Sequence, residues 1–492
     1  MTAESSTDDV QLRAEIDRSL RFPLLFFFGS AGVWLVFSSL LGLISSLSLN
    51  LPGLFGNLTI FHYGRIYPAH MNALIYGWAI QAGFGVALWI MARLSRVPAR
   101  NATRLIVAGH LWNFAILVGL LGILFGHGTS IQWMDFPKAC WPIMLISYVL
   151  IVFELMAMFN TRRDKKPYIS QIYLLGAALW FPWIFLTANL FVHNDDGGAV
   201  AKATVNAWYT SNLIYMVLAP VALAASYYIV PKVIGRPIYS YGLANVGFWT
   251  LALFTGWTGI NRIMGGPFPA WMATVGSTAT IFLLIPALAV AINQLKTMEG
   301  RFSWSNYSPS LRFTVFATVA FVVTVIVGAF LSLHPVAKML QFTNAQAGYE
   351  LMAIYGFFTM GMFGAVYFIV PRICGCEWLK GSWIRFHFLF AAYGIATIAG
   401  FTLFGGLAEG SVIADHNKDF IVSVELGWSY LVGRILGWIF ILLSNVMFVF
   451  HIGLMIIRRG RRGEEGPTLL HGEPEKYFEV EKQLAADDGA NA

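Results

Sequence analysis

The sequence Arg65-Ile66-Tyr67-Pro68-Ala69-His70-Met71-Asn72 opens an apolar run that continues to residue 92. A helix of about 20 apolar residues spans the hydrocarbon core of a bilayer. Eleven further runs of similar length lie along the chain, joined by short connections. The approximate limits of the twelve runs are 22–46, 69–92, 105–126, 139–159, 171–192, 206–230, 243–261, 271–295, 313–333, 348–370, 384–407 and 429–457. This pattern predicts an all-α integral membrane protein with twelve transmembrane helices.

The composition of the whole chain supports the same class. Of its 492 residues, 57% are hydrophobic and only 12% are charged, and the mean hydropathy is +0.65. Soluble proteins carry about 25% charged residues, so this chain has too few to cover a water-facing surface of its size. The composition therefore excludes a soluble enzyme, a nucleic-acid-binding module and a disordered scaffold. Three cysteines are too few for a disulfide framework.

The basic residues that give the chain its net charge of +7 are unevenly distributed among the segments that connect the apolar runs. If the amino terminus is placed inside, 25 of the 32 Lys and Arg residues fall in inner segments and 7 fall on the outer side. Cytoplasmic loops of membrane proteins are enriched in Lys and Arg. We therefore predict that both termini are cytoplasmic, and we expect no nucleic acid partner because the charge surplus marks topology.

Three segments are expected along the chain. Residues 1–21 form a polar cytoplasmic segment, residues 22–457 form the twelve-helix membrane domain, and residues 458–492 form a polar cytoplasmic tail. No linker interrupts the series of apolar runs, so the membrane part is interpreted as one domain.

One motif repeats within the membrane domain. Tyr227-Tyr228-Ile229-Val230-Pro231-Lys232 ends the sixth run, and Tyr367-Phe368-Ile369-Val370-Pro371-Arg372 ends the tenth. We interpret the repeat as a sign of a bundle built from four-span units. The alternative is that inner helix ends often carry a proline and a basic residue.

Ionisable side chains inside apolar runs are costly and are functional candidates by default. His70 lies close to the start of the second run and after Pro68, and it ranks above the other histidines as a candidate iron ligand. The alternative is a hydrogen-bonded residue at a helix interface. Glu154 and Glu350 are candidates for proton transfer if they are buried among helices. Because Glu350 lies near the outer end of its run, we favour a non-functional interpretation for it, in which the carboxylate reaches headgroup water or is held neutral by burial.

The chain resembles subunit I of the haem-copper oxidases, in particular the C-family (cbb3-type) cytochrome c oxidases. The stretches that carry the resemblance are Gly64 to Ala73, Ala87 to Ser95, Asn206-Ala207-Trp208-Tyr209, Tyr227 to Pro237, Gly265-Gly266-Pro267-Phe268-Pro269-Ala270-Trp271 and Phe357 to Arg372. The resemblance implies a twelve-helix bundle of three quasi-repeated four-helix arcs. It also implies location in the bacterial cytoplasmic (inner) membrane.

Active members of that family need six histidines and a tyrosine, and the resemblance matches each to a position in this chain. The first ligand of the low-spin haem corresponds to His70 and is present. The five other histidine positions hold Ser211, Asn261, Arg262, Tyr349 and Leu351. The tyrosine position holds Thr255. One ligand of six remains, so the chain departs from the family at most of its metal sites.

These replacements change the expected cofactors. Ser, Asn and Arg cannot replace three imidazoles around copper, because a guanidinium stays protonated and has no lone pair for a metal. We therefore expect no copper, no binuclear centre and no oxygen reduction by the family mechanism. At most one b-type haem is expected, held through His70. It would need either another sixth ligand or five-coordinate iron.

Arg262 allows two interpretations. It replaces the positive charge of copper and pairs with a carboxylate or with Tyr349 in the emptied cavity, or it extends outward from the end of the seventh run to the headgroup region. We favour the second interpretation on sequence alone.

The leading functional prediction is a degenerate homologue that serves as an accessory or electron-transfer subunit. Its expected partners are the lipid bilayer, other respiratory membrane subunits and a c-type cytochrome. The alternatives are a transporter or channel that uses the emptied cavity, a purely structural assembly subunit, and a divergent oxidase or nitric oxide reductase. The last fits poorly, because such reductases keep most of the family's histidines.

Overall fold

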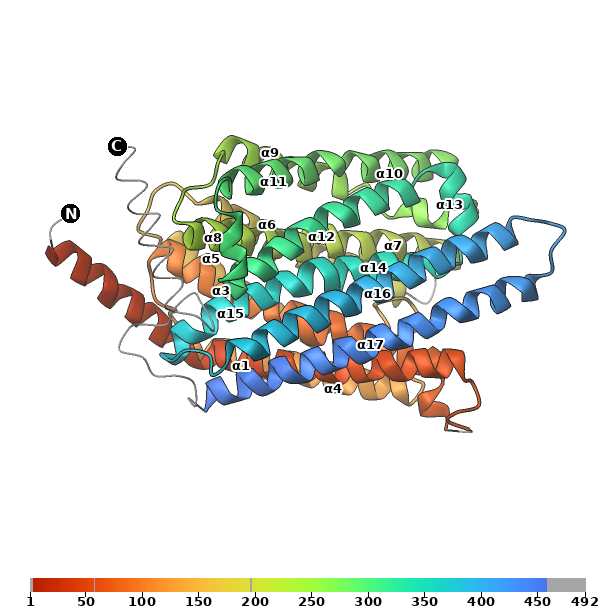
Figure 1. Cartoon of the computed structure of the whole chain (residues 1–492), viewed down its shortest axis with the longest axis horizontal. Helices are drawn as coiled ribbons and strands as arrows, with labels where there is room; N and C mark the ends of the chain where they lie inside the picture. Colours follow the sequence, from red (N-terminus) through yellow and green to blue (C-terminus); the bar gives the residue numbers. More distant parts are fainter. Residues whose placement is uncertain (1–2, 57, 195–196, 458–492) are drawn as a thin grey trace.

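The computed structural model describes residues 3–56, 58–194 and 197–457, with side chains described from residue 11 onward, and within these ranges it contains helices and no strands. Figure 1 shows a bundle of long, roughly parallel helices. The elements are α1 (Ala3–Asn50), α2 (Tyr63–Asn72), η2 (Ala73–Ile80), α3 (Gln81–Ser95), α4 (Ala102–Leu124), α5 (Cys140–Asn160), α6 (Ile169–Val192), α7 (Ala199–Asn212), η3 (Leu213–Leu218), α8 (Ala219–Ile234), α9 (Tyr241–Thr255), η4 (Ile260–Ile263), α10 (Ala270–Phe282), α11 (Leu284–Thr297), α12 (Pro309–Leu331), α13 (His334–Leu340), α14 (Ala345–Leu351), η6 (Met352–Thr359), α15 (Met360–Cys374), α16 (Gly381–Ile413) and α17 (Phe420–Ile456). Two short 3₁₀ turns, η1 (Thr59–Phe61) and η5 (Phe302–Asn306), complete the series.

Eleven helices in the described part are long and apolar enough to cross a membrane, which confirms a multi-pass all-helical protein. The seventh predicted run, 243–261, forms the shorter helix α9 of 15 residues. The helix ends at Thr255 because the chain turns at Gly259, which has a φ of 102°. A Cβ at Gly259 would lie 2.2 Å from the Ala207 carbonyl oxygen, so this close approach requires glycine. The count of twelve spans stays a prediction.

Three helices form the centre of the bundle, and each contains a π-helical segment. They are α2–η2–α3, α7–η3–α8 and α14–η6–α15, and the most apolar window of each is completely buried. They correspond to the second, sixth and tenth apolar runs, four runs apart. π-Helical turns widen a helix and often occur at functional sites. The spacing supports a fold of repeated four-span units.

The repeated motif lies at equivalent positions in two of these central helices. Pro231 lies in the last turn of α8 and Pro371 in the last turn of α15. Each helix then ends at a glycine in the left-handed region, Gly235 with a φ of 71° and Gly375 with a φ of 67°. The glycine C-cap explains the sharp end of both helices.

The outer helices present apolar side chains outward. Phe153, Trp249 and Phe404 are 59%, 65% and 66% exposed. Such a surface suits the hydrocarbon of a bilayer. Glu154, by contrast, is buried and accepts hydrogen bonds from the backbone N–H groups of Arg100 (2.6 Å) and Asn101 (3.3 Å) at the start of α4. Its contacts indicate that it caps a helix.

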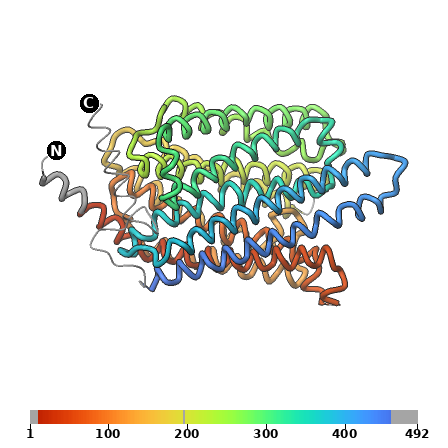
Figure 2. Tube along the Cα trace, viewed as in Figure 1, coloured from red at the N-terminus to blue at the C-terminus, as the bar shows by residue number. Residues whose placement is uncertain are grey.

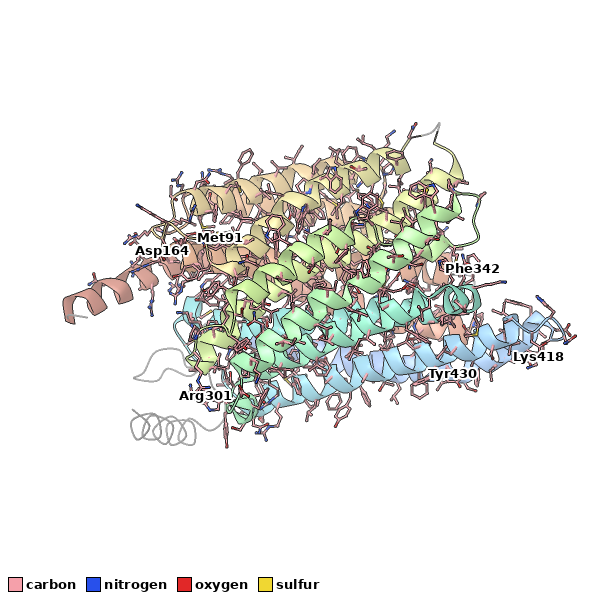
Figure 3. The ribbon with its side chains drawn as sticks, turned by 90° about the horizontal axis from the view of Figure 1, so that it is seen from above. Met91, Asp164, Arg301, Phe342, Lys418 and Tyr430 are labelled. Carbon is pink, nitrogen blue, oxygen red and sulfur yellow. The ribbon has the colours of Figure 1, made fainter. Side chains whose placement is uncertain are left out.

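The two ends of the bundle are named after residues that lie at them. Asp164 and Arg301 lie at one end, and Phe342 and Lys418 lie at the other (Figure 3); we call these the Arg301 end and the Phe342 end. The described chain starts and finishes at the Arg301 end (Figures 1 and 2). This end carries the loops that we predicted to be cytoplasmic. The predicted polar segment 1–21 is continuous with the first span from Ala3, because both belong to α1. The predicted tail 458–492 lies outside the described residues.

Candidate functional site

His70 lies in the last turn of α2, directly before the π-helical segment η2. The residue is fully buried. Its Nδ1 lies 2.8 Å from the carbonyl oxygen of Ser38 on α1 and 3.1 Å from the Ser38 hydroxyl. Its Nε2 is buried and has no hydrogen-bond partner within the described part of the chain. When Nδ1–H donates to a carbonyl, the Nε2 lone pair is free, which is the arrangement found in metal-ligating histidines.

Two residues pack directly against the imidazole. The Trp438 ring on α17 meets it edge to face, with ring centroids 4.6 Å apart. Gly42 on α1 lies on another side, where an added Cβ would stand 3.0 Å from His70 Cε1 and 3.0 Å from the Trp438 ring. The absence of a side chain at residue 42 therefore allows α1 to approach His70.

Arg434 lies one helical turn before Trp438 on the same face of α17. Its side chain is completely buried, and its Nε, Nη1 and Nη2 atoms have no hydrogen-bond partner among the described residues. The guanidinium stands over the ring of Tyr67, 5.4 Å from the ring centroid. A buried cation without a counter-ion costs several kcal/mol. The site therefore suits an anionic group.

The unpartnered groups around His70 fit a haem in two respects. A free imidazole nitrogen can bind iron, and a buried guanidinium can bind a carboxylate. Leu351, the residue that stands where the resemblance places the opposing axial histidine, is buried and has no lone pair. Of these two positions, His70 could hold the iron of a haem and Leu351 could not.

A cavity of about 340 Å³ lies nearer the Phe342 end. Its walls come from α7, η4, α10, α14 and the segment from α12 through α13. It brings together four of the replaced ligand positions, Ser211, Asn261, Arg262 and Tyr349. His70, Thr255 and Leu351 do not line it. Phe342, which is 95% exposed, lies at its edge and marks its approach to the surface (Figure 3).

Arg262 points into this cavity. Its Nη1 donates to Glu350 Oε1 at 3.2 Å and to Thr210 Oγ1 at 3.1 Å. The guanidinium also stands over the Tyr349 ring, 5.5 Å from its centroid. The outward extension that we favoured from sequence is therefore wrong. The residue lies in η4, after the turn that ends α9, and this position directs it toward α14.

Glu350 is buried, so the first of its two non-functional interpretations, contact with headgroup water, is wrong. It accepts hydrogen bonds from Gln132 Nε2 at 2.7 Å and from Gln346 Nε2 at 3.0 Å, in addition to Arg262. Three donors therefore hold the carboxylate in place. An ionised carboxylate is compatible with burial when it is paired and hydrogen-bonded in this way.

The other replaced positions carry ordinary polar hydrogen bonds. Ser211 Oγ lies 2.7 Å from Thr258 Oγ1, and Asn261 Oδ1 accepts from the backbone N–H of Gly259 at 3.2 Å. The hydroxyls of Tyr349 and Tyr215 are 2.7 Å apart. Thr255 is buried at the end of α9, and none of the residues that the structure describes forms a hydrogen bond with its hydroxyl.

Sequence reasoning assigned no role to Arg434 or to Asp135. Arg434 was visible as an ionisable residue inside the last run, and its spacing of four from Trp438 is the signal that places both on one face.

Asp135 lies in the loop between α4 and α5. Its carboxylate accepts a hydrogen bond from Asn72 Nδ2 at 2.6 Å, and Asn72 lies near the start of the second apolar run. Burial raises the pKa of Asp135 to about 6, while the Asn72 hydrogen bond opposes that rise.

Comparisons with known proteins agree with this architecture. The family model described as Cytochrome C and Quinol oxidase polypeptide I matches residues 23–456. The cytochrome c oxidase subunit 1 homolog of Agrobacterium tumefaciens (strain T37) is 24% identical over 456 residues, covering 88% of this chain and 83% of the relative. The cbb3-type cytochrome c oxidase subunit CcoN1 of Stutzerimonas stutzeri is 24% identical over 426 residues, covering 82% of this chain and 88% of the relative.

A solved structure shares the fold. It is a heme-copper terminal oxidase dimer determined by cryo-EM, with a TM-score of 0.75 and 13% identity, and the match covers 93% of this chain and 87% of that one. The family match spans nearly the whole membrane domain. The chain belongs to the cytochrome c and quinol oxidase polypeptide I family.

Proposed function

We propose that this chain is an electron-transfer or accessory subunit of a respiratory assembly in the bacterial inner membrane, with one b-type haem bound through His70. In this proposal the chain crosses the membrane twelve times and keeps both termini in the cytoplasm. The observation that carries the proposal is the pair of buried, unpartnered groups, His70 Nε2 and the Arg434 guanidinium. An iron porphyrin with carboxylate side chains is the group in this family that would satisfy both.

The residues around His70 have separate roles in this proposal. The Ser38 carbonyl oxygen accepts a hydrogen bond from Nδ1–H and so favours the tautomer that leaves Nε2 free. Trp438 and Gly42 hold the imidazole ring in its orientation. Arg434 neutralises a carboxylate in a place that water does not reach. When bound, a b haem supplies one-electron transfer.

We propose that the cavity at Arg262 does not reduce oxygen. The three positions that hold copper in the family carry Ser211, Asn261 and Arg262, and the guanidinium would repel a metal ion in the same space. Two of these side chains already make hydrogen bonds with neighbouring residues, to Thr258 and to the backbone of Gly259. The chain would therefore exchange electrons with a partner, for which a c-type cytochrome or another respiratory subunit is the candidate.

The test is a reduced-minus-oxidised visible spectrum of the purified full-length protein, with a pyridine haemochrome assay and metal analysis. We expect one b-type haem per chain and no stoichiometric copper. His70→Ala should abolish the haem signal, whereas His110→Ala should keep it, because His110 lies exposed on α4 and stacks on Phe26. A preparation that contains no haem, or an unchanged spectrum in His70→Ala, would reject the haem proposal. Copper at one equivalent would reject the loss of the binuclear site.

A second candidate function is the binding or transport of a small solute in the Arg262 cavity. The observation that favours it is the orientation of the guanidinium, whose hydrogen bonds to Thr210 and Glu350 both come from Nη1. Nε and Nη2 remain to meet a carboxylate in a volume of about 340 Å³. Equilibrium binding of radiolabelled acetate and succinate tests it. Binding that Arg262→Gln abolishes and Arg65→Gln retains would support it, and no saturable binding would reject it.

A further inference from the structure

A second polar hollow, of about 450 Å³, lies at the Arg301 end where α1 meets the ends of α3 and α15. Apart from Ala14, its lining residues are charged, namely Arg13, Asp17, Arg18, Arg21, Arg93 and Arg372. Five arginines face a single carboxylate in this space. α1 projects beyond the bundle at this end (Figure 1). The hollow therefore combines strong positive charge with access from the surface.

The single carboxylate in the hollow is already engaged. Asp17 Oδ2 pairs with Arg93 Nη1 at 3.2 Å, and Asp17 Oδ1 accepts from Trp89 Nε1 at 2.9 Å. The Arg93 guanidinium also stands 5.1 Å from the centroid of the Trp89 ring. Asp17 thus pairs directly with Arg93 and holds it in place, and a single carboxylate in the hollow cannot balance the charge of all five arginines.

Two of those arginines are held by neutral acceptors. Arg21 Nε donates to the Ile373 carbonyl oxygen at 2.7 Å, and Arg372 Nη1 donates to the Phe368 carbonyl oxygen. A carbonyl fixes the position of a guanidinium and does not cancel its charge. Neither these two residues nor Arg18 forms an ion pair with a carboxylate within the described residues. Two guanidinium groups held in place, those of Arg21 and Arg372, and the exposed Arg18 therefore line one hollow.

The hollow lies at the edge of the apolar surface. Phe22 follows Arg21 directly, is 74% exposed and begins the first apolar run. A group bound by the arginines would thus lie beside the level at which lipid-facing side chains begin. The phosphate of a membrane lipid occupies this level, and basic pockets on the cytoplasmic side of membrane proteins bind anionic headgroups.

We propose that the hollow formed by Arg18, Arg21 and Arg372 binds a phosphate oxyanion, supplied by the headgroup of an anionic phospholipid. Guanidinium groups match phosphate oxygens with paired N–H donors, and several of them around one anion give affinity and orientation. The proposal concerns the Arg301 end and does not depend on haem at His70.

The test uses the full-length protein in nanodiscs of phosphatidylcholine, with and without phosphatidylglycerol. Wild type should melt at a higher temperature when phosphatidylglycerol is present. It should also retain this lipid in native mass spectrometry after detergent extraction. In Arg18→Gln/Arg21→Gln, the apparent affinity for phosphatidylglycerol should fall about tenfold or more, since each basic residue near an anionic surface contributes about 1 kcal/mol. Lys296→Gln serves as a control at the same end, because Lys296 is paired with Glu299 at 3.0 Å and lies outside the hollow.

A separate arm uses inorganic phosphate and wild type in phosphatidylcholine. A shift equal to that of phosphatidylglycerol, lost in Arg18→Gln/Arg21→Gln, supports the oxyanion site with free phosphate as its source. Equal phosphatidylglycerol dependence in wild type and the double variant overturns the proposal, as does the absence of any response to either anion. The single variant Arg18→Gln, at an exposed position, provides the same comparison if the double variant does not fold.

Discussion

Arg262 Nη1 and Glu350 Oε1 form an ion pair of 3.2 Å between η4 and α14, at the wall of the cavity that Ser211 and Tyr349 also line. The Glu350 side chain is 2% exposed and that of Arg262 is 15% exposed. The pair therefore places a fixed positive charge in the cavity and balances it with one buried carboxylate. It connects two segments that are expected to carry metal ligands in active relatives.

Glu350→Gln should destabilise the protein, because it leaves the Arg262 charge without its counter-ion in a largely buried place. Removal of one partner of a buried pair costs roughly 3–5 kcal/mol, and the partial exposure of Arg262 puts the expected loss at the lower limit. Thermal unfolding in detergent should show a clearly lower melting temperature. In the double variant Arg262→Gln/Glu350→Gln much of this loss should be recovered. A double variant as unstable as the sum of both single variants would show that the pair is not coupled.

The sequence predicted the helical architecture well, because runs of about 20 apolar residues have one stable solution in a bilayer. It predicted the end of α9 poorly. The apolar composition continues past Thr255, while the helix ends where Gly259 passes close to the Ala207 carbonyl oxygen. That contact joins residues far apart in the chain and leaves no local pattern.

The candidate site was likewise predictable in part. Family resemblance pointed to Ser211, Asn261, Arg262 and Tyr349, and these four side chains line one cavity. The direction of Arg262 was not predictable, since outward extension and inward pairing depend on the depth of η4 and on Glu350 in another helix. The Arg434 cluster likewise needs the packing of α17 against α2, which no spacing within either segment reveals.

Lower pH should stabilise the protein through Asp135. Its pKa is raised to about 6 from 3.8, so the folded state disfavours the ionised form. The penalty is absent below pH 3.8, grows as pH rises through the interval to about 6, and is complete above it. Asp135→Asn should remove a destabilisation of up to about 3 kcal/mol at pH 7. Melting temperatures of wild type and variant, measured from pH 4 to 7, should converge at the acidic end; parallel curves would contradict this account.

Gly42→Ala adds only one methyl group, but it should displace the His70 ring or the Trp438 ring. The added Cβ would stand 3.0 Å from His70 Cε1 and from the Trp438 ring, so one of the two rings must move. Overpacking of this kind costs typically about 1–3 kcal/mol. The expected result is a lower melting temperature together with a shifted or weakened haem spectrum. Gly453→Ala on α17 is the matched control, since nothing lies within 4 Å of its added Cβ. Equal behaviour of the two variants would argue against a constrained site at His70.

Arg434→Gln should act in opposite directions on the haem-bound and haem-free protein. Loss of a nearby positive charge disfavours the extra electron of the reduced haem, so the midpoint potential should fall, while Arg434→Lys should keep most of the wild-type value. In protein prepared without haem, the same Arg434→Gln change should raise the melting temperature, because it removes a completely buried cation whose three nitrogens have no partner among the described residues. Redox titration followed optically measures the first effect, and thermal unfolding after expression under haem limitation measures the second. An unchanged midpoint potential in Arg434→Gln would show that Arg434 does not lie near the haem. A lower melting temperature of the haem-free variant would show that the guanidinium has a stabilising partner.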